Sequence, residues 1–376
     1  MIPTLNPLAG GPPDGIKSLV SGLNENNCNS TVITFDDSNS EWLLDYKFSI
    51  LAIGSNSTKY GFTKNAIKII KKNSFNYDFL IVHGIWQFHS LAVYFALKNS
   101  QIPYYVFIHG ALDPWFKKYY PLKHIKKFFY WILFEYHVLK NAKGVLYTSE
   151  EEKLLAKQSF KPHSFIEEVV GFGKEDNVLS LENGNYLFDN FPSLKEKKFI
   201  LYVSRIHEKK GFDILLRAFK EIANDYPEYY LVMMGPDPDN FQKKYENDIL
   251  SNIKSRIIWT GWVDASLKWE AYKKADVYIL SSHSENWGAT VVESLMCGTP
   301  VLLSNKVNIW REVENCNAGL VDEDTIDGTK RLLLSWIKSD DKTKRKIAQN
   351  SRKCFEKNFD NIKAAKKLLD VVNKND

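Results

Sequence analysis

The chain has 376 residues, of which 44% are hydrophobic and 25% are charged, a composition typical of globular proteins. Its net charge of +5 suits an anionic substrate or membrane surface but is too small to indicate a nucleic-acid-binding protein. No apolar run is long enough to cross a bilayer, and the opening Met1-Ile2-Pro3 is unlike a signal peptide, so we expect a cytoplasmic protein.

Strands and helices alternate from residue 16 onward, with a pause in the glycine- and asparagine-rich stretch 171–197. Such alternation is typical of parallel sheets with helices on both faces, and the pause predicts two doubly wound domains with a cleft between them. We place these domains at 1–185 and 186–358, followed by a C-terminal helix at 359–376. The predicted strands are 31–35, 48–53, 79–83, 104–109, 145–148, 199–203, 230–234, 257–260, 277–280, 301–303 and 319–321.

A lysine-rich segment at 117–143 contains a single acidic residue, Glu135, and a run of aromatic and aliphatic residues at 128–134. A basic amphipathic helix with aromatic residues suits an anionic membrane surface. It is equally typical of a helix that buries its aromatic face and leaves its lysines in solvent. The sequence alone favours neither interpretation.

In the second domain, the strand 199–203 leads into a basic loop that opens a helix, and the loop contains Arg205 and Lys210. Ligands of doubly wound sheets bind beyond the C-terminal ends of the strands. Fixed cations at that edge can stabilise the charge that develops on a departing diphosphate.

The most informative stretch is 277–304, which predicts a strand, a loop, a short helix, a tight turn and another strand. Glu285 lies in the loop and Glu293 lies inside the helix. The backbone N–H groups at the start of that helix have no partner within it, so they attract a phosphate. The residues that open the helix are Gly288, Ala289 and Thr290. An anion-binding site flanked by two carboxylates suits a sugar nucleotide.

This stretch resembles the signature of the retaining family 4 glycosyltransferases. That signature has two glutamates separated by seven residues, here Glu285 and Glu293, and a small-residue turn with Pro-Val, here 297–301. Trp287 stands where the family usually has phenylalanine. The resemblance covers nearly the whole chain. It implies the GT-B fold, an α/β architecture of two Rossmann-like domains facing across a cleft, with the last helix crossing back to the first domain.

The resemblance also implies roles for individual residues. Glu285 would face the donor sugar, Glu293 would bind the ribose hydroxyls, and Arg205 with Lys210 would hold the diphosphate. From the first domain, His109 would approach the donor sugar. Further donor contacts are implied for Gly10, Gly11, Asn286, Gly288, Ala289 and Thr290.

Three other features bear on this interpretation. His83, like His109, ends a predicted strand, but a structural role for it is favoured. The pair Asp237 and Asp239 has the spacing of a metal-binding motif of another glycosyltransferase fold, yet its position favours a loop near the nucleotide base. The family begins with a strand that is almost absent here: either residues 1–5 supply a stub, or the true start lies upstream, which we favour.

The function implied is transfer of a sugar from a UDP- or GDP-linked donor to a glycan or lipid-linked acceptor. The reaction would be retaining and of the hexosyltransferase type, would need no metal or other cofactor, and would serve surface polysaccharide or lipopolysaccharide assembly. Segment 117–143 could then hold the enzyme at the inner face of the cell membrane. The alternatives are a nucleotide-sugar epimerase of similar fold and a non-catalytic sugar-binding protein.

Overall fold

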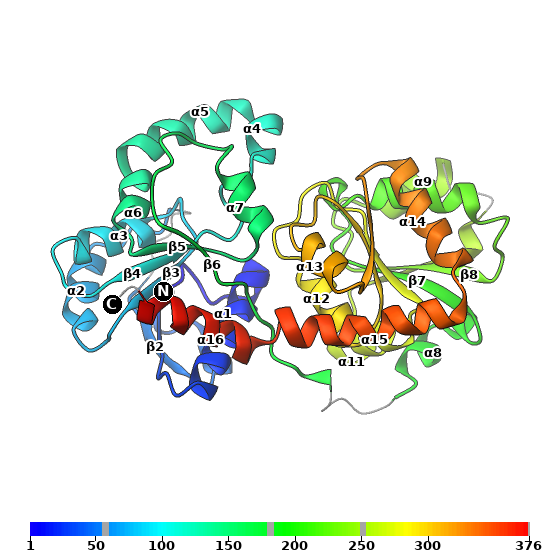
Figure 1. The fold of residues 1–376 in the computed structure, drawn as a ribbon, viewed down its shortest axis with the longest axis horizontal. Helices are drawn as coiled ribbons and strands as arrows, with labels where there is room; N and C mark the ends of the chain where they lie inside the picture. The colour runs from blue at the N-terminus through cyan, green and yellow to red at the C-terminus, as the bar shows by residue number, and fades with distance from the viewer. Residues whose placement is uncertain (55–59, 179–183, 249–252, 375–376) are drawn as a thin grey trace. The chain divides into compact units, whose positions relative to one another are not determined.

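A computed structural model describes residues 1–54, 60–178, 184–248 and 253–374. The chain forms two compact units, one made of Met1–Glu175 with Asp360–Asp376 and the other of Asp176–Phe359. Figure 1 shows both units.

The second unit is built on six parallel strands in the order β12-β11-β10-β7-β8-β9. In this doubly wound order, the chain runs from β7 through β8 to β9 at one edge of the sheet. It then crosses back to β10 on the other side of β7 and continues to β12 at the opposite edge. The topological switch point therefore lies between β7 and β10. The strands are β7 (Lys198–Val203), β8 (Tyr229–Met234), β9 (Ile257–Gly261), β10 (Val277–Leu280), β11 (Val301–Ser304) and β12 (Gly319–Asp322).

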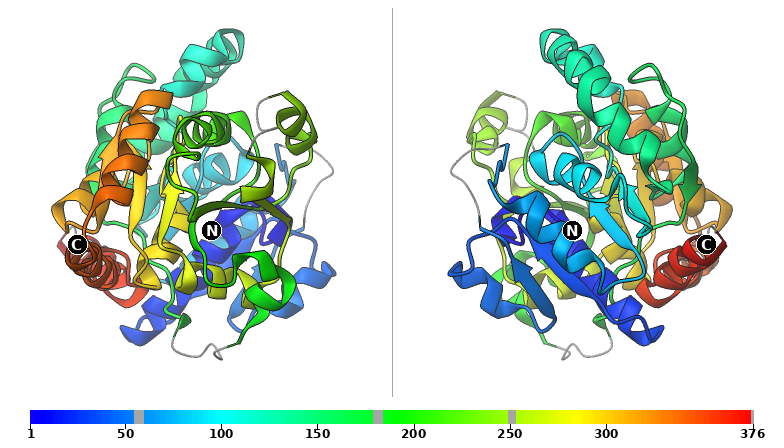
Figure 2. Two further views of the ribbon diagram at one scale, coloured as in Figure 1. Left: turned by 90° about the vertical axis from the view of Figure 1, so that its right-hand side faces the viewer. Right: turned by 90° about the vertical axis from the view of Figure 1, so that its left-hand side faces the viewer.

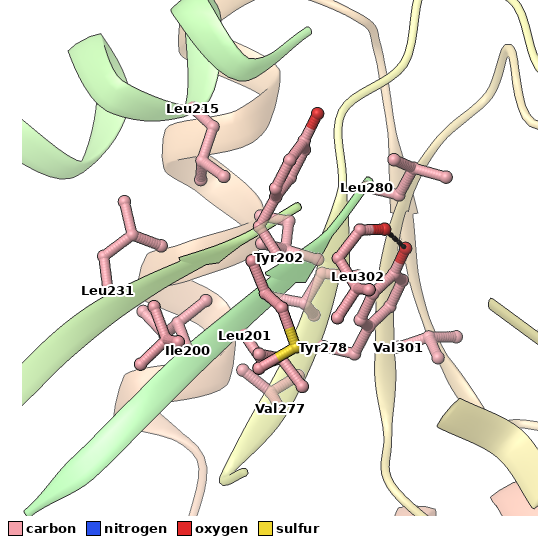
Figure 3. Packing of buried hydrophobic residues seen from close by; sticks show 14 of the residues in the cluster. Ile200, Leu201, Tyr202, Leu215, Leu231, Val277, Tyr278, Leu280, Val301 and Leu302 are labelled. Carbon is pink, nitrogen blue, oxygen red and sulfur yellow. Dashed lines mark hydrogen bonds between the residues drawn. The ribbon is translucent and has the colours of Figure 1, made fainter. Parts of the chain in front are cut away.

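Helices cover this sheet and complete its core. The strand β7 contributes Phe199–Val203 as a continuous buried run, as expected for a strand covered on both faces. Figure 3 shows side chains of β7, β8, β10 and β11 packed together with Leu215 of a covering helix. The helices are α8 (Tyr186–Asn190), α9 (Phe212–Ile222), α10 (Phe241–Asp248), α11 (Ala265–Lys274), α12 (Ala289–Met296), α13 (Trp310–Asn315), α14 (Ile326–Lys338) and α15 (Asp341–Asn358).

The first unit contains a two-stranded sheet, β1-β2, and a four-stranded sheet in the order β3-β4-β5-β6, all parallel. All five strands predicted for this unit are confirmed. The polar edge strand β6 was missed. The strands are β1 (Thr31–Thr34), β2 (Ser49–Ala52), β3 (Leu80–His83), β4 (Tyr104–Phe107), β5 (Gly144–Tyr147) and β6 (Glu167–Val169).

Met1 and Ile2 lie between these two sheets and supply the stub considered from the sequence. The N–H of Ile2 donates to the carbonyl of Ile33 at 3.0 Å, and the carbonyl of Met1 accepts from His83 at 2.8 Å. Ile2 also pairs in parallel with Thr34. The residues thus join β1 to β3, in the place where the fold needs its first strand.

The C-terminal helix α16 belongs to the first unit and packs along α1 (Figures 1 and 2). The two helices approach so closely that a Cβ on Gly22 would lie 2.3 Å from the carbonyl oxygen of Asn361. The helices of this unit are α1 (Gly11–Glu25), α2 (Ala66–Ser74), α3 (Phe88–Leu97), α4 (Trp115–Tyr119), α5 (Pro121–Tyr130), α6 (Tyr136–Asn141), α7 (Glu150–Ala156) and α16 (Asn361–Lys374).

The lysine-rich segment forms α4, α5 and a π-helical stretch, Trp131–Glu135, on the outside of the first unit (Figures 1 and 2). Its aromatic face is not buried, contrary to one of the two sequence interpretations. Of its described aromatic side chains, only Trp131 is fully enclosed, whereas Phe129 and the aliphatic Leu133 are each 63% exposed. None of the described helices combines the length and the apolar character needed to span a membrane.

Candidate active site

The basic loop after β7 is held in place by its own backbone and by the neighbouring loop after β8. The N–H of Ser204 donates to Met234 O at 3.0 Å, and the N–H of the buried Ile206 donates to Pro236 O at 2.9 Å. Between them, Arg205 extends into solvent, and among the described residues no acidic side chain forms an ion pair with it. The loop therefore presents an uncompensated guanidinium at the C-terminal edge of the sheet.

This loop is fastened to the loop that follows β10, on the other side of the switch point. The carbonyl of Lys209 accepts from the N–H of His283 and from the hydroxyl of Ser282, both at 2.9 Å. Gly211 has φ +65°, and a Cβ there would lie 1.9 Å from the carbonyl oxygen of Ser281. Only glycine permits this approach, which brings segments far apart in the sequence into direct contact.

Lys210 and Glu285 meet where these two loops touch. The ammonium of Lys210 forms an ion pair with Oε2 of Glu285, and about a fifth of each side chain remains exposed, 23% and 20% respectively. A partly exposed pair of this kind can exchange one partner for an incoming charged ligand at modest cost.

The backbone around Glu285 is fixed by the loop that follows β11. The N–H of Glu285 donates to Lys306 O and its carbonyl accepts from Asn308, both at 2.9 Å. The buried amide of Asn308 also donates to Oδ1 of Asn286 at 3.3 Å. Because three successive strands of the sheet contribute to this support, the position of Glu285 is defined by the sheet itself.

The helix α12 begins directly behind Glu285, as predicted. Its N-cap is Gly288, with φ +64° and no side-chain cap, and the ideal Cβ of that glycine lies 3.5 Å from Cγ of Glu285. Among the described residues, the N–H groups of Gly288, Ala289 and Thr290 have no hydrogen-bond acceptor. The hydroxyl of Thr290 is bonded to Tyr278 at 2.7 Å. The helix therefore offers backbone donors beside the Lys210–Glu285 pair.

Glu293 lies one turn further along α12, is only 5% exposed, and faces α11. Its Oε1 lies 3.1 Å from the ammonium of Lys268, and its Oε2 accepts from the Tyr272 hydroxyl at the same distance. These two partners were not identified from the sequence, because nothing in the spacing of α11 marks them as neighbours of Glu293. They hold a buried carboxylate that would otherwise be costly.

A second ionic pair braces the loop after β10 from another side. Nδ1 of His283 lies 2.9 Å from Oδ2 of Asp324, and this hydrogen bond raises the pKa of His283 above its ordinary value. Burial alone would raise the pKa of Asp324, but the hydrogen bond and charge of His283, together with a backbone hydrogen bond and the charge of Lys306, lower it. Nothing in the spacing of the sequence marks this pair either.

The first unit holds the remaining predicted site residues. Nε2 of His109 lies 2.9 Å from Nδ1 of His83, and the two rings stack on each other. Burial lowers the pKa of His109 to about 4 and that of His83 well below its ordinary value, so both imidazoles are neutral at pH 7. His109 also has φ +48°, an uncommon conformation that is typical of functional positions.

Gly10 and Gly11 lie at the exposed start of α1. The φ of Gly10 is +92°, a conformation that favours glycine. An added Cβ would meet no atom within 4 Å at either glycine. Packing in the first unit therefore does not explain Gly11.

Asp237 caps a helix rather than joining a metal site. Its two carboxylate oxygens accept the N–H groups of Phe241 and Gln242, at 2.9 and 2.8 Å, at the start of α10. Within 1–54, 60–178, 184–248 and 253–374, no group of three or more potential ligand side chains is placed to hold a metal ion.

Two protein-family models match the chain and together cover most of it. A model described as "Glycosyl transferases group 1" matches residues 187–354, which contain the site around Lys210 and Glu285. A model described as "Glycosyltransferase Family 4" matches residues 9–164.

Individual relatives are more distant. The mannosylfructose-phosphate synthase of Agrobacterium fabrum is 27% identical over 125 residues, 31% of this chain and 28% of that protein. The alpha-monoglucosyldiacylglycerol synthase of Streptococcus pneumoniae is 34% identical over 111 residues, 28% of this chain and 24% of that protein. The aligned part thus spans less than half the length of these curated relatives.

Solved structures share the whole fold. The structure of Anabaena Alr3699/HepE in complex with UDP has a TM-score of 0.77 at 15% identity, covering 99% of this chain and 98% of the other. A glycosyltransferase from Rickettsia africae has a TM-score of 0.74 at 18% identity, covering 100% and 97%. With two Rossmann-like units and both family models matched, the chain has the GT-B fold and belongs to the group 1, family 4 glycosyltransferases.

Proposed function

We propose that this protein transfers a sugar from a nucleoside-diphosphate sugar to an acceptor hydroxyl and retains the configuration of the anomeric carbon. The observation that carries the proposal is the contact between the loops after β7 and β10, which places Lys210 against Glu285 at the switch point of the sheet. Nucleotides bind at such switch points in doubly wound folds.

The diphosphate would bind to the cations and the backbone donors at this edge. Arg205 and Lys210 supply positive charge, and the N–H groups at the start of α12 supply donors that need no reorganisation. In the free protein Glu285 neutralises Lys210. When the diphosphate takes over Lys210, the carboxylate of Glu285 is released toward the donor sugar, where it stabilises the positive charge of an oxocarbenium-like transition state.

The remaining residues would orient the donor. Glu293, already held by Lys268 and Tyr272, accepts hydrogen bonds from the ribose hydroxyls. Asn286 contacts the sugar, and the glycine loop at Gly10 and Gly11 leaves room for phosphates to approach the backbone. Neutral His109 can donate a hydrogen bond to the sugar without adding charge.

The reaction would proceed without a metal ion. The bond between the anomeric carbon and the diphosphate oxygen breaks as the acceptor oxygen attacks from the same face. The acceptor proton passes to the departing phosphate, whose added charge is met by Arg205, Lys210 and the start of α12. A uridine nucleotide is the first donor to test, because the similar Anabaena protein was solved with UDP.

The acceptor is proposed to be a glycan or a lipid-linked glycan at the inner face of the cell membrane, in surface polysaccharide or lipopolysaccharide assembly. The exposed apolar residues of α5 and the adjoining π-helix, with Lys123 and Lys126 beside them, suit an anionic membrane surface. They form a patch of Leu122, Ile125, Phe128, Phe129, Ile132 and Leu133.

The test combines binding and turnover. A thermal-shift panel of UDP, GDP and their sugars in the presence of a chelator should raise the melting temperature with one nucleotide family. Lys210→Gln should lower turnover about a hundredfold, which corresponds to roughly 3 kcal/mol of lost transition-state stabilisation. Lys209→Gln, one residue away in the same loop and outside the Lys210–Glu285 ion pair, is the matched control.

Three results would contradict the proposal. Loss of all nucleotide binding in the chelator would refute the metal-independent site. Isomerised donor sugar formed without an acceptor would favour an epimerase. Binding of sugar with no turnover, unchanged by Glu285→Gln, would favour a sugar-binding protein.

A further inference from the structure

The first unit contains a cavity that none of the proposed donor contacts uses. Its volume is about 310 Å³, at the lower end of the range for small-molecule sites and room for roughly ten water molecules. Three segments enclose it: the loop after β4, the beginning of α5, and the turn after α7. The lining residues are Ala111, Asp113, Tyr120, Lys123, His124, Lys127, Ser159 and Phe160.

Aromatic rings form one part of the wall and are fixed by their neighbours. The rings of His124 and Phe160 stack with centroids 4.3 Å apart, and Phe160 in turn stacks on the buried Trp131 at 5.3 Å. Tyr120 carries the ammonium of Lys123 at 4.8 Å from its ring centroid. Phe160 is only 4% exposed and serves as the support of His124, whose own ring is partly exposed. A flat ring held in this way suits the apolar C–H face of a sugar ring.

Positive charge dominates the cavity. Lys123 and Lys127 both line it, and Asp113 is the one carboxylate among its lining residues. The pKa of His124 is lowered by burial and by the charges of Lys117 and Lys127, so its ring is neutral at pH 7. The net charge at the wall is therefore positive, which favours a ligand that carries an anionic group.

The cavity also contains a polar group, the hydroxyl of Ser159, that has no hydrogen-bond partner among the described residues. Ser159 is only 6% exposed and lines the cavity, and among the described residues its hydroxyl forms no hydrogen bond. Buried hydroxyls are usually satisfied, so this one is available to a ligand or a water molecule. A sugar hydroxyl can both donate to and accept from it.

We propose that this cavity binds the acceptor, and that the acceptor unit it takes is a sugar with an acidic substituent, either a carboxylate or a phosphate. Lys123 and Lys127 hold the anionic group, His124 supports the sugar ring with Phe160 stacked on it, and Ser159 with Asp113 bonds the sugar hydroxyls. The inference rests on the proposed transferase function, because only a transferase needs a second sugar site.

Its place in the chain supports this role. Ala111 and Asp113 belong to the same short loop as His109, the residue of this unit proposed to reach the donor sugar. The loop is tied down, since the indole N–H of Trp86 donates to Ala111 O at 3.1 Å and the Asp113 carboxylate accepts the N–H of Trp115 at 2.8 Å. A sugar seated in the cavity is thus held by the segment that carries His109.

The experiment measures binding to the full chain by ligand-detected NMR and calorimetry. The probes are methyl glucuronide and glucose 1-phosphate as acidic sugars, methyl glucoside as their neutral counterpart, and inorganic phosphate as the anion alone. The variant is Lys123→Gln, which removes a lysine that lines the cavity. The matched control is Lys126→Gln, which removes an exposed lysine of the same helix that does not line it. UDP binding is measured on every variant.

We expect at least one acidic sugar to bind at millimolar concentration, more tightly than methyl glucoside and than phosphate. Lys123→Gln should weaken that binding roughly ten- to hundredfold, the effect of losing one charge-assisted hydrogen bond. The variant Lys126→Gln should bind like the parent. Preference for the carboxylate or for the phosphate probe then identifies the source of the charge.

Other results would overturn the inference. These are failure of both acidic sugars to bind, equal binding of neutral and acidic sugars, phosphate binding as tightly as the sugar phosphate, or equal loss in both lysine variants. If UDP still binds while these probes fail, the acceptor cavity is refuted and the transferase proposal stands. If neither UDP nor GDP binds, the proposed function itself fails.

Discussion

Replacing Gly211 by alanine should damage the junction on which the candidate site depends. The residue has φ +65°, which costs an L-residue about 1–2 kcal/mol. The new Cβ would lie 1.9 Å from Ser281 O and 2.6 Å from its carbonyl carbon. Because these are backbone atoms at the end of β10, relieving the overlap requires the sheet or the turn to shift, at a further cost of about 1–3 kcal/mol. The unfolding free energy should fall by roughly 2–5 kcal/mol.

Thermal and urea unfolding measure this loss. For a unit of this size each kcal/mol lowers the melting temperature by about 2–4 °C, so a decrease of about 4–20 °C is expected. The stabilisation by UDP should shrink as well, because the shift separates Lys210 from Glu285.

Gly298→Ala is the matched control. Gly298 also has positive φ, +75°, but the nearest atom to its Cβ is Ala348 O at 3.7 Å, an ordinary contact. It should lose only the conformational part, about 1–2 kcal/mol. Equal destabilisation by the two substitutions would refute the reasoning that close approach of the two loops, rather than backbone conformation alone, requires glycine at position 211.

Three further predictions concern charge and surface. Burial raises the pKa of Glu135 to about 7, so the unfolding free energy should decline as pH rises from 4.5 through 7. In urea titrations, Glu135→Gln should raise the unfolding free energy by up to about 3 kcal/mol at pH 8 and leave it unchanged at pH 4. Because the pKa of His283 is raised, its pairing with Asp324 stabilises the fold below pH 6.5 and loses this effect as pH rises through the raised pKa. Asp324→Asn should therefore lower the unfolding free energy at pH 5.5 and change it little at pH 9. An equal loss of unfolding free energy at both pH values would contradict the pairing. Phe129→Ser should reduce sedimentation with phosphatidylglycerol vesicles, whereas Phe75→Ser, at a position just as exposed but outside the lysine-rich segment, should not.

The sequence predicted those features that have a local cause. Continuous apolar runs such as 199–203 fix strands in any context, and each predicted strand is present. The start of α12 at Gly288 was predictable because only a few residue types open a helix with positive φ. Since parallel strands bring their C-terminal ends to one edge, the order of elements predicted that the loops carrying Lys210 and Glu285 lie at the same edge, but not the ion pair between the two side chains.

What the sequence did not reveal depends on contacts between distant segments. Lys268 and Tyr272 reach Glu293 only because α11 lies beside α12, and a charged and an aromatic residue on a helix carry no mark of such a role. The strand β6 contains Glu167 and Glu168, which an edge strand tolerates but a hydrophobicity pattern does not detect. The two-residue stub at Met1 is too short for any periodicity.

The acceptor cavity could not be predicted from the sequence for the same reason. Its walls come from three separate segments, and its aromatic residues were counted in the sequence only as part of a lysine-rich helix. The question of whether that helix buries its aromatic face could be answered only by the fold, which encloses Trp131 and leaves Phe129 exposed.

The contact between Gly22 and Asn361 has a consequence for how the chain is made. During translation, the face of α1 that receives α16 leaves the ribosome hundreds of residues before its partner does, and the entire second unit is synthesised in between. That unit holds all of its own strands and can fold as soon as it emerges, whereas the first unit must keep an apolar surface open until α16 emerges. A chain shortened by its last helix would never close that surface, and aggregation or degradation would follow from the first unit, not from the one nearest the cut.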